Sequence, residues 1–164
     1  HANYLSGEIR EVIETPLGPV RYRYHSMADL EGIEDDSFDL VYSGQTFEHV
    51  TPHDGRRVLA EVHRVLRPGG QLCLDTPNRR VTGLQLRGTG QDFIDPDHEI
   101  EYTDAQMRSL FVEYGFDVQR AHGLGLLQHG ASADTFDPIE LRHSTGLYDD
   151  IESSYLLAYV CVAV

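Results

Sequence analysis

The sequence contains no lysine and no tryptophan, and only two of its 164 residues are cysteine. All thirteen cationic side chains are therefore arginine, against 27 acidic residues, and the formal net charge is −14. A field of that sign repels phosphate backbones, so we expect no nucleic-acid partner. Two cysteines without a C-x-x-C pair indicate neither a disulfide framework nor a zinc knuckle.

Long apolar runs are missing as well. No run approaches the ~20 residues that a membrane-spanning helix needs, and no charged-then-apolar signal pattern opens the chain. With 40% apolar residues, the chain is large enough to bury one hydrophobic core. We therefore expect a soluble, cytoplasmic protein with no membrane partner, forming a single domain over residues 1–164.

Three candidate strands precede the first clear helix. Residues 8–14 are ambiguous between a short helix and a strand. Residues 20–25 alternate and are rich in aromatic side chains, which predicts a strand. The run FDLVYS at residues 38–43 is short and apolar, as is typical of buried strands in parallel sheets.

The next segment predicts a helix and a further strand. Thr51 is placed as the N-cap, with Pro52 at the first helical position. Apolar residues recur at helical spacing from Val58 to Leu66. The PGG sequence at 68–70 ends this helix and leads into an apolar strand at 71–76.

After residue 78, strands and helices are predicted in a less regular order. Residues 79–97 show no period and predict a long loop over the sheet. Residues 103–106, TDAQ, predict a capping box that opens a helix, and 116–120 follow as a strand. Residues 123–150 predict irregular structure, and the apolar run at 155–164 closes the chain as a strand.

Residues 37–78 carry a family resemblance. The pattern D-x-SFD-L-V, then EHV, then E-V-x-R-V-L-x-PGG and an apolar strand resembles the second half of a class I S-adenosylmethionine-dependent methyltransferase of type 11. The resemblance covers about residues 19–164 and implies an α/β, Rossmann-like sheet with helices on both faces. The family's strand order is 3-2-1-4-5-7-6, with the seventh strand antiparallel. Its strands three to seven would be Val20–His25, Phe38–Ser43, Gln71–Thr76, Phe116–Arg120 and Tyr155–Val164.

The family's glycine-rich turn after its first strand has no counterpart here, since residues 1–36 hold only the isolated Gly7, Gly18 and Gly32. The first two strands of the family are therefore lacking. Their loss would leave a gap on the order of 10 Å in the sheet, with unpaired strand edges. We expect the missing segment to lie outside this sequence, which starts at His1; the alternatives are a rewired sheet, or a second chain, from a homo-oligomer or another partner, that fills the gap.

The resemblance also implies a cofactor site for S-adenosylmethionine. In the family the loop after strand three meets the adenine, and here it holds Ala28 and Asp29. The residues just after strand four line the methionine side of the cofactor, and here they are Ser43, Gly44 and Gln45. Asp29 can equally be a solvated loop acid, whereas a glycine directly after a buried strand favours close approach of a ligand.

Two histidines are candidates for catalysis. His49, one short loop beyond strand four, lies at the edge where open α/β sheets bind ligands and can remove a proton from an acceptor, or simply orient the next helix. His98 is interpreted first as an acceptor-pocket residue, second as a solvated histidine and third as a metal ligand beside Asp97 and Glu101. That spacing matches no zinc pattern, so no metal is predicted.

The resemblance implies methyl transfer from S-adenosylmethionine to a small-molecule or sugar hydroxyl by direct displacement. The enzyme then contributes alignment more than acid or base chemistry. The alternative is a methyltransferase-like module that binds no cofactor, is not catalytic and serves in interactions. Upstream residues that carry a glycine-rich turn would favour the enzyme.

Overall fold

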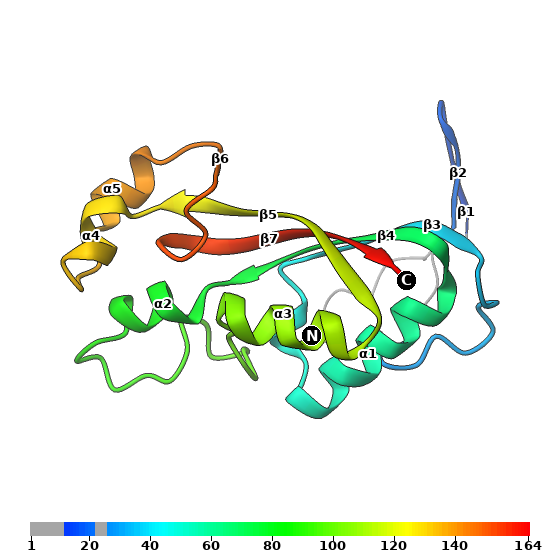
Figure 1. Ribbon diagram of the computed structural model, residues 1–164, viewed down its shortest axis with the longest axis horizontal. Helices are drawn as coiled ribbons and strands as arrows, with labels where there is room; N and C mark the ends of the chain where they lie inside the picture. Colours follow the sequence, from blue (N-terminus) through cyan, green and yellow to red (C-terminus); the bar gives the residue numbers. More distant parts are fainter. Residues whose placement is uncertain (1–11, 22–25) are drawn as a thin grey trace.

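A five-stranded sheet forms the centre of the computed structural model, in which residues 12–21 and 26–164 are described (Figure 1). Its first two strands pair in parallel, and every other neighbouring pair is antiparallel. In spatial order the strands are β3 (Phe38–Gly44), β4 (Leu66–Pro77), β7 (Ser154–Ala163), β5 (Phe116–Leu126) and β6 (Leu147–Tyr148).

The parallel pair β3 and β4 is joined by a helical crossover, as parallel strands require. It consists of the short 3-10 helix η2 (Phe47–His49) and helix α1 (Pro52–Val65). Thr51 Oγ1 accepts a hydrogen bond from the Asp54 amide at 3.1 Å, so the predicted N-cap is confirmed. The Ser37 amide donates to the Val65 carbonyl at 2.9 Å, which ties the start of β3 to the end of α1.

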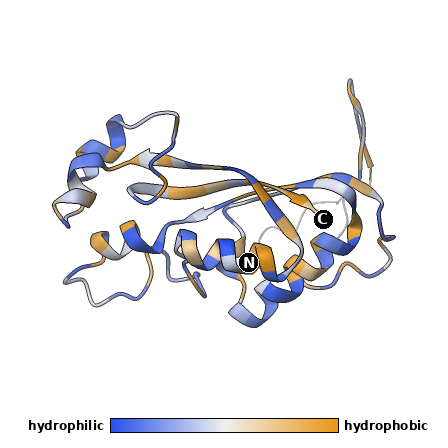
Figure 2. Cartoon of the chain, in the orientation of Figure 1, coloured by the Kyte–Doolittle hydropathy of each residue, from blue (hydrophilic) through white to orange (hydrophobic). Residues whose placement is uncertain are grey.

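Helices α1 and α3 (Asp104–Glu113) contribute the helical side of the core. The predicted capping box at the start of α3 is present, with Thr103 and Gln106 bonded reciprocally. Phe111 of α3 packs edge-on against Tyr159 of β7, with ring centroids 5.1 Å apart. Figure 2 shows β7 coloured mostly as hydrophobic. Fully buried members of this core include Phe47, Leu59, Met107, Phe111, Leu157 and Cys161.

Three further short helices lie where the sequence predicted loop. Helix α2 (Arg79–Gln85) replaces the first part of the predicted loop at 79–97, because the Asn78 side chain caps it by accepting from the Arg80 amide. Helices α4 (Gln128–Ser132) and α5 (Pro138–His143) lie in the region predicted as irregular. In Figure 1, α1–α3 lie below the sheet, and α4 and α5 lie beyond its left end. No helix among the described residues is both long and apolar enough to cross a bilayer.

The Rossmann-like methyltransferase fold is confirmed. The strands predicted as family strands four, five, seven and six lie side by side in that order. Of the strand predicted at 20–25, residues 22–25 lie outside the described residues. Residues 20 and 21 belong to β2 (Gly18–Arg21), which within the described part of the chain pairs with β1 (Val12–Thr15) in a two-stranded sheet apart from the other five strands. The strands that would connect it to β3 are not among those described.

Strand β3 forms one edge of the five-stranded sheet, because among the described residues it pairs with β4 alone. Its side chains were expected to be buried, yet Phe38 is 44% exposed, Leu40 51% and Tyr42 71%. A parallel strand is buried only when it has neighbours on both sides and cover on both faces. The prediction of burial was therefore wrong for these residues, although the prediction of a strand was right.

Asn78 joins the end of β4 to the start of β7. Its Nδ2 donates to the carbonyls of Ile151, Glu152 and Ser154, at 3.1, 3.3 and 2.8 Å, while its Oδ1 caps α2. The side chain is 1% exposed. Buried carbonyls that lose a donor cost free energy, so this one amide stabilises the chain at several points.

We expect Asn78→Asp to lower the free energy of unfolding by about 3 kcal/mol. The aspartate keeps the cap on α2 but replaces the donating NH2 group with an oxygen that faces three carbonyls. Urea unfolding monitored by circular dichroism measures the change. The matched control is Gln91→Glu, an exposed amide-to-acid exchange, which should alter stability by less than about 0.5 kcal/mol. Equal effects of the two variants would contradict the role given to Asn78.

Candidate functional site

The carboxyl end of β3 makes a sharp turn that is fastened to β4. Gln45 has a φ of +48°, in the left-handed region that is unfavourable for residues other than glycine. Its amide donates to the Asp75 carbonyl at 3.1 Å, and its Nε2 donates to Asp75 Oδ1 at 2.7 Å. A Cβ added at Gly44 would overlap the Tyr42 hydroxyl. The turn is therefore strained and closely packed, as is common at ligand-binding edges.

Ser43, next to this turn, has a buried hydroxyl. Its Oγ has no hydrogen-bond partner among residues 12–21 and 26–164. Buried polar atoms are nearly always satisfied, by protein, water or a ligand. Ser43, Gly44 and Gln45 lie together at the end of β3, where the sequence predicted contacts with the methionine part of the cofactor.

Ala28 and Asp29 lie elsewhere. Ala28 is buried in the core, and Asp29 is exposed, with its Oδ1 accepting from the Glu31 amide at 3.2 Å. The next residue, Leu30, is bound to Glu61 and Arg64 in the last turns of α1. Those turns adjoin the start of β3, whereas the turn after β3 leads through η2 into the first turn of α1, a helix about 20 Å long. The structure therefore does not bring the two predicted parts of the cofactor site together.

Glu61 and Arg64 form a clamp on the segment from Leu30 to Ile33, and this clamp was not predicted. The Leu30 amide donates to Glu61 Oε2 at 2.9 Å, and Arg64 Nη1 donates to the Ile33 carbonyl at 2.8 Å. Arg64 also donates two hydrogen bonds to the Glu61 carboxylate. These bonds from Arg64, followed by the Leu30 amide, lower the pKa of Glu61 to about 2. The i, i+3 spacing of Glu61 and Arg64 on α1 was visible in the sequence. Their contacts with Leu30 and Ile33 were not, because those residues are about thirty positions away in the chain.

Glu48 and His49 follow the turn, on η2. The Glu48 side chain is buried, 1% exposed, and its Oε2 accepts from Thr76 Oγ1 at 2.9 Å. The Glu48 carbonyl accepts from the amides of Glu99 and Ile100, at 2.9 and 3.2 Å. These bonds fasten the loop before α3 to η2, and so they place His98 beside His49.

The two histidines are held by their Nδ1 atoms. His49 Nδ1 lies 3.1 Å from the Asp97 carbonyl, and His98 Nδ1 lies 2.9 Å from Glu101 Oε1. The Glu101 side chain is itself fully buried and accepts from Thr82 Oγ1 and, at 3.0 Å, from the Ile94 amide. Because carbonyl and carboxylate oxygens only accept, each Nδ1 is the donor of its hydrogen bond, and in the neutral ring the lone pair is then on Nε2.

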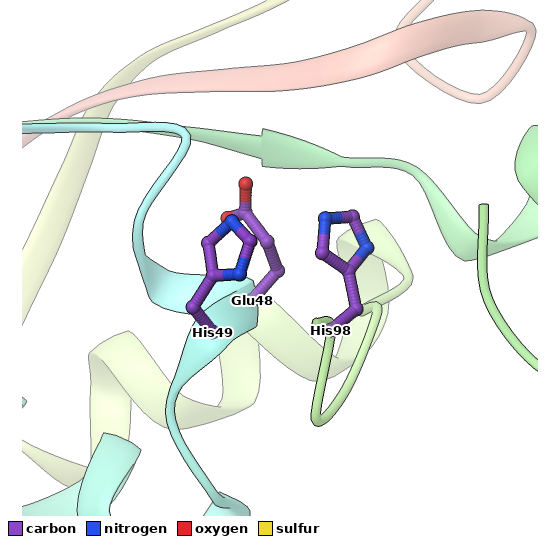
Figure 3. Close-up of side chains that lie close together, drawn as sticks. All are labelled: Glu48, His49 and His98. Carbon is purple, nitrogen blue, oxygen red and sulfur yellow. The ribbon is translucent and has the colours of Figure 1, made fainter. Parts of the chain in front are cut away.

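Glu48, His49 and His98 converge in one cluster (Figure 3). One ligand atom of each lies within 4.8 Å of those of the others, and the two imidazole rings meet edge-on with centroids 4.8 Å apart. Both histidines were predicted from the sequence, whereas Glu48 was not. The adjacent acid and histidine of FEHV, just beyond a predicted strand, were the available signal.

Comparisons with known proteins agree with this architecture. The model of a family described as a methyltransferase domain matches residues 5–74. A Mycolicibacterium smegmatis protein named "probable S-adenosylmethionine-dependent methyltransferase" is 35% identical over 121 residues, which are 69% of this chain and 44% of that protein. The ubiquinone biosynthesis O-methyltransferase of Xanthomonas oryzae pv. oryzae is 36% identical over 75 residues, 46% of this chain and 30% of that protein.

A solved S-adenosylmethionine-dependent methyltransferase from Thermotoga maritima shares the fold, with a TM-score of 0.65 and 16% identity over 85% of this chain and 62% of that one. Sheet order, relatives and fold together place the chain among the class I S-adenosylmethionine-dependent methyltransferases. The predicted family is confirmed. The chain spans less than half the length of both curated relatives named above.

We expect Glu61→Gln to remove a pH-dependent part of the stability. The folded pKa of Glu61, about 2, lies below its ordinary value of 4.5. The stabilisation by the ionised clamp is therefore complete above about pH 4.5 and is lost as the pH falls toward about 2. The difference in unfolding free energy between wild type and variant, measured by urea unfolding at a series of pH values, should shrink over that range.

The matched control is Glu113→Gln, which removes an exposed glutamate whose ion pair with Arg56 spans 4.0 Å. It should show almost no difference from wild type at any pH, because exposed pairs at that distance contribute little. A Glu61→Gln difference that stays constant from neutral to acid pH would disprove the charged clamp.

Proposed function

We propose that this chain forms part of a methyltransferase that transfers the methyl group of S-adenosylmethionine to a hydroxyl oxygen of a small molecule or sugar. The observation that carries the proposal is the arrangement at one sheet edge. Ser43, Gly44 and Gln45 follow β3, and His49 and His98 lie on the adjoining segments. Open α/β sheets bind ligands at this carboxyl edge. The name of the Xanthomonas relative, an O-methyltransferase, supports oxygen as the acceptor atom.

The reaction needs alignment of three atoms. The acceptor oxygen forms a bond to the methyl carbon while the carbon–sulfur bond breaks, and its electron pair stays on sulfur, leaving S-adenosylhomocysteine. S-adenosylmethionine supplies an activated methyl group, so the protein mainly has to orient the acceptor and exclude water. The acceptor hydroxyl also loses its proton, and the Nε2 lone pairs of His49 and His98 are the basic groups at this place.

The cofactor contacts divide into two groups in this proposal. Ser43, Gly44 and Gln45 contact the methionine part. The strained turn supports this, as does the Ser43 hydroxyl, which has no hydrogen-bond partner among the described residues. Contacts of Ala28 and Asp29 with the adenine stay a prediction, because the structure holds that loop near the other end of α1.

The open edge of β3 supports a second role for this chain, as a domain completed by pairing. Phe38, Leu40 and Tyr42 are apolar or aromatic and between 44% and 71% exposed along that edge. An exposed apolar edge strand favours pairing with a further strand. Such a strand, from a longer form of the chain, a second copy or another protein, would complete the sheet. A module of this kind without cofactor is the alternative function.

Calorimetric titration of S-adenosylhomocysteine separates the two functions. The titration uses the 164-residue chain beside a form extended upstream. Binding by both forms supports the enzyme with a site built from the described residues, and binding by the extended form alone assigns the adenosine contacts to upstream residues. If neither form binds, the enzyme proposal fails and the pairing role remains. The net charge of −14 supports a small-molecule acceptor over a nucleic acid.

We expect Gly44→Val to weaken S-adenosylhomocysteine binding by about tenfold or more, in whichever form binds it. The new side chain would displace the Tyr42 ring and occupy the approach to the end of β3. Gly83→Ala in α2, where an added Cβ meets nothing within 4 Å, is the matched control and should bind like wild type. Thermal melts check that both variants fold. Unchanged affinity in a folded Gly44→Val variant would exclude Gly44 from the cofactor site.

A further inference from the structure

We infer that Glu48, His49 and His98 bind a divalent transition-metal cation. The three side chains come from η2 and from the loop before α3, and they point toward one another in Figure 3. Two imidazoles and one carboxylate form a common ligand set for metals such as Zn²⁺ and Fe²⁺ in enzymes that leave positions open for substrate. Among the described residues, this is the cluster in which three such groups meet.

The hydrogen bonds of the two rings prepare them as ligands. Metal-bound histidines typically donate their other N–H to a carboxylate or a backbone carbonyl, which fixes the tautomer and the ring orientation. Here His98 donates to the Glu101 carboxylate and His49 to the Asp97 carbonyl. Both Nε2 atoms lie outside these hydrogen bonds and can coordinate a cation. Glu101, named with His98 in the sequence analysis, thus acts as a positioning residue rather than a ligand.

The burial of Glu48 also favours a cation. Its side chain is 1% exposed, and the described residues provide it with a hydrogen bond from Thr76 but with no ion pair to an arginine or histidine. A buried carboxylate is costly unless it is paired or coordinates a metal. A cation between Glu48 and the two imidazoles would compensate this charge.

The spacing is compatible with coordination after a small closure. Ligand atoms about 2.1 Å from a tetrahedral Zn²⁺ lie roughly 3.4 Å from one another. The atoms of the cluster lie within 4.8 Å of one another, so approaches on the order of 1 Å suffice. His49 is exposed and can adjust its side chain, while Glu48 and His98 are held by buried contacts.

The use of such a metal rests on the proposed function, whereas the metal site itself does not. A cation with three protein ligands keeps at least one position for the oxygen of the acceptor. Binding to the cation lowers the pKa of a hydroxyl, which releases its proton to solvent and leaves the oxygen ready to attack the methyl carbon. In this arrangement His49 and His98 act as ligands, and no side chain has to accept the proton.

Metal titration tests the site directly. The chain is freed of metal with a chelator, and Zn²⁺, Mn²⁺ and Mg²⁺ are titrated separately by calorimetry, with the visible spectrum of Co²⁺ as a second readout. We expect one Zn²⁺ or Co²⁺ per chain, and at least about tenfold weaker binding for Glu48→Gln and for His49→Ala. Glu48→Gln keeps the shape and the bond to Thr76, and His49 is exposed, so both variants should fold.

The matched control is His53→Ala, which removes an exposed histidine from the first turn of α1. It should bind Zn²⁺ like wild type. Loss of affinity in Glu48→Gln and His49→Ala but not in His53→Ala supports the site. Absent binding in wild type, or equal binding in all four proteins, overturns it.

Methyl-transfer assays with and without chelator test the use of the metal separately. Metal binding without an effect of the chelator on methyl transfer would refute the role in catalysis and leave the site standing. Methyl transfer by a protein that binds no metal would mean that His49 and His98 act as proton acceptors and not as metal ligands. Failure of methyl transfer in every form would refute the proposed function while the metal titration still decides the site.

Discussion

The parallel pairing of β3 with β4 is the constraint on which the rest of the structure depends. Parallel neighbours need a crossover, and here it consists of η2 and α1, with the end of α1 tied back to the start of β3. The carboxyl ends of both strands consequently lie at one edge. The crossover therefore starts at this edge, and it places Gln45, Glu48 and His49 there.

Glu48 links the edge to the rest of the chain through two different bonds. Its carboxylate meets Thr76 at the end of β4, and its carbonyl holds the amides of Glu99 and Ile100. One residue thus joins the crossover to the next strand and to the loop before α3. The buried carboxylate that accepts from Thr76 is costly to ionise without a cation, which connects the stability of the edge with its chemistry.

Features that depend on neighbouring residues in the chain were predictable. The N-cap at Thr51, the capping box at Thr103 and the strand before Gly44 follow from side chains within a few positions. Helix α2 was missed because its cap, Asn78, is held by carbonyls more than seventy residues away. The exposure of β3 was missed because an apolar run predicts a strand but not the number of its neighbours.

For the site, the sequence by itself determined which functional groups were available: two histidines and a glycine directly after a strand. It also determined the family resemblance. Only the tertiary structure decided how these groups combine. It separated Ala28 and Asp29 from Gly44, since contacts with α1 hold their loop near the other end of that helix. It brought His98 to Glu48 and His49 across about fifty residues, because backbone hydrogen bonds to Glu48 fasten two distant segments together. Residue types and local propensities depend on the local sequence, whereas burial and proximity arise only when distant segments pack.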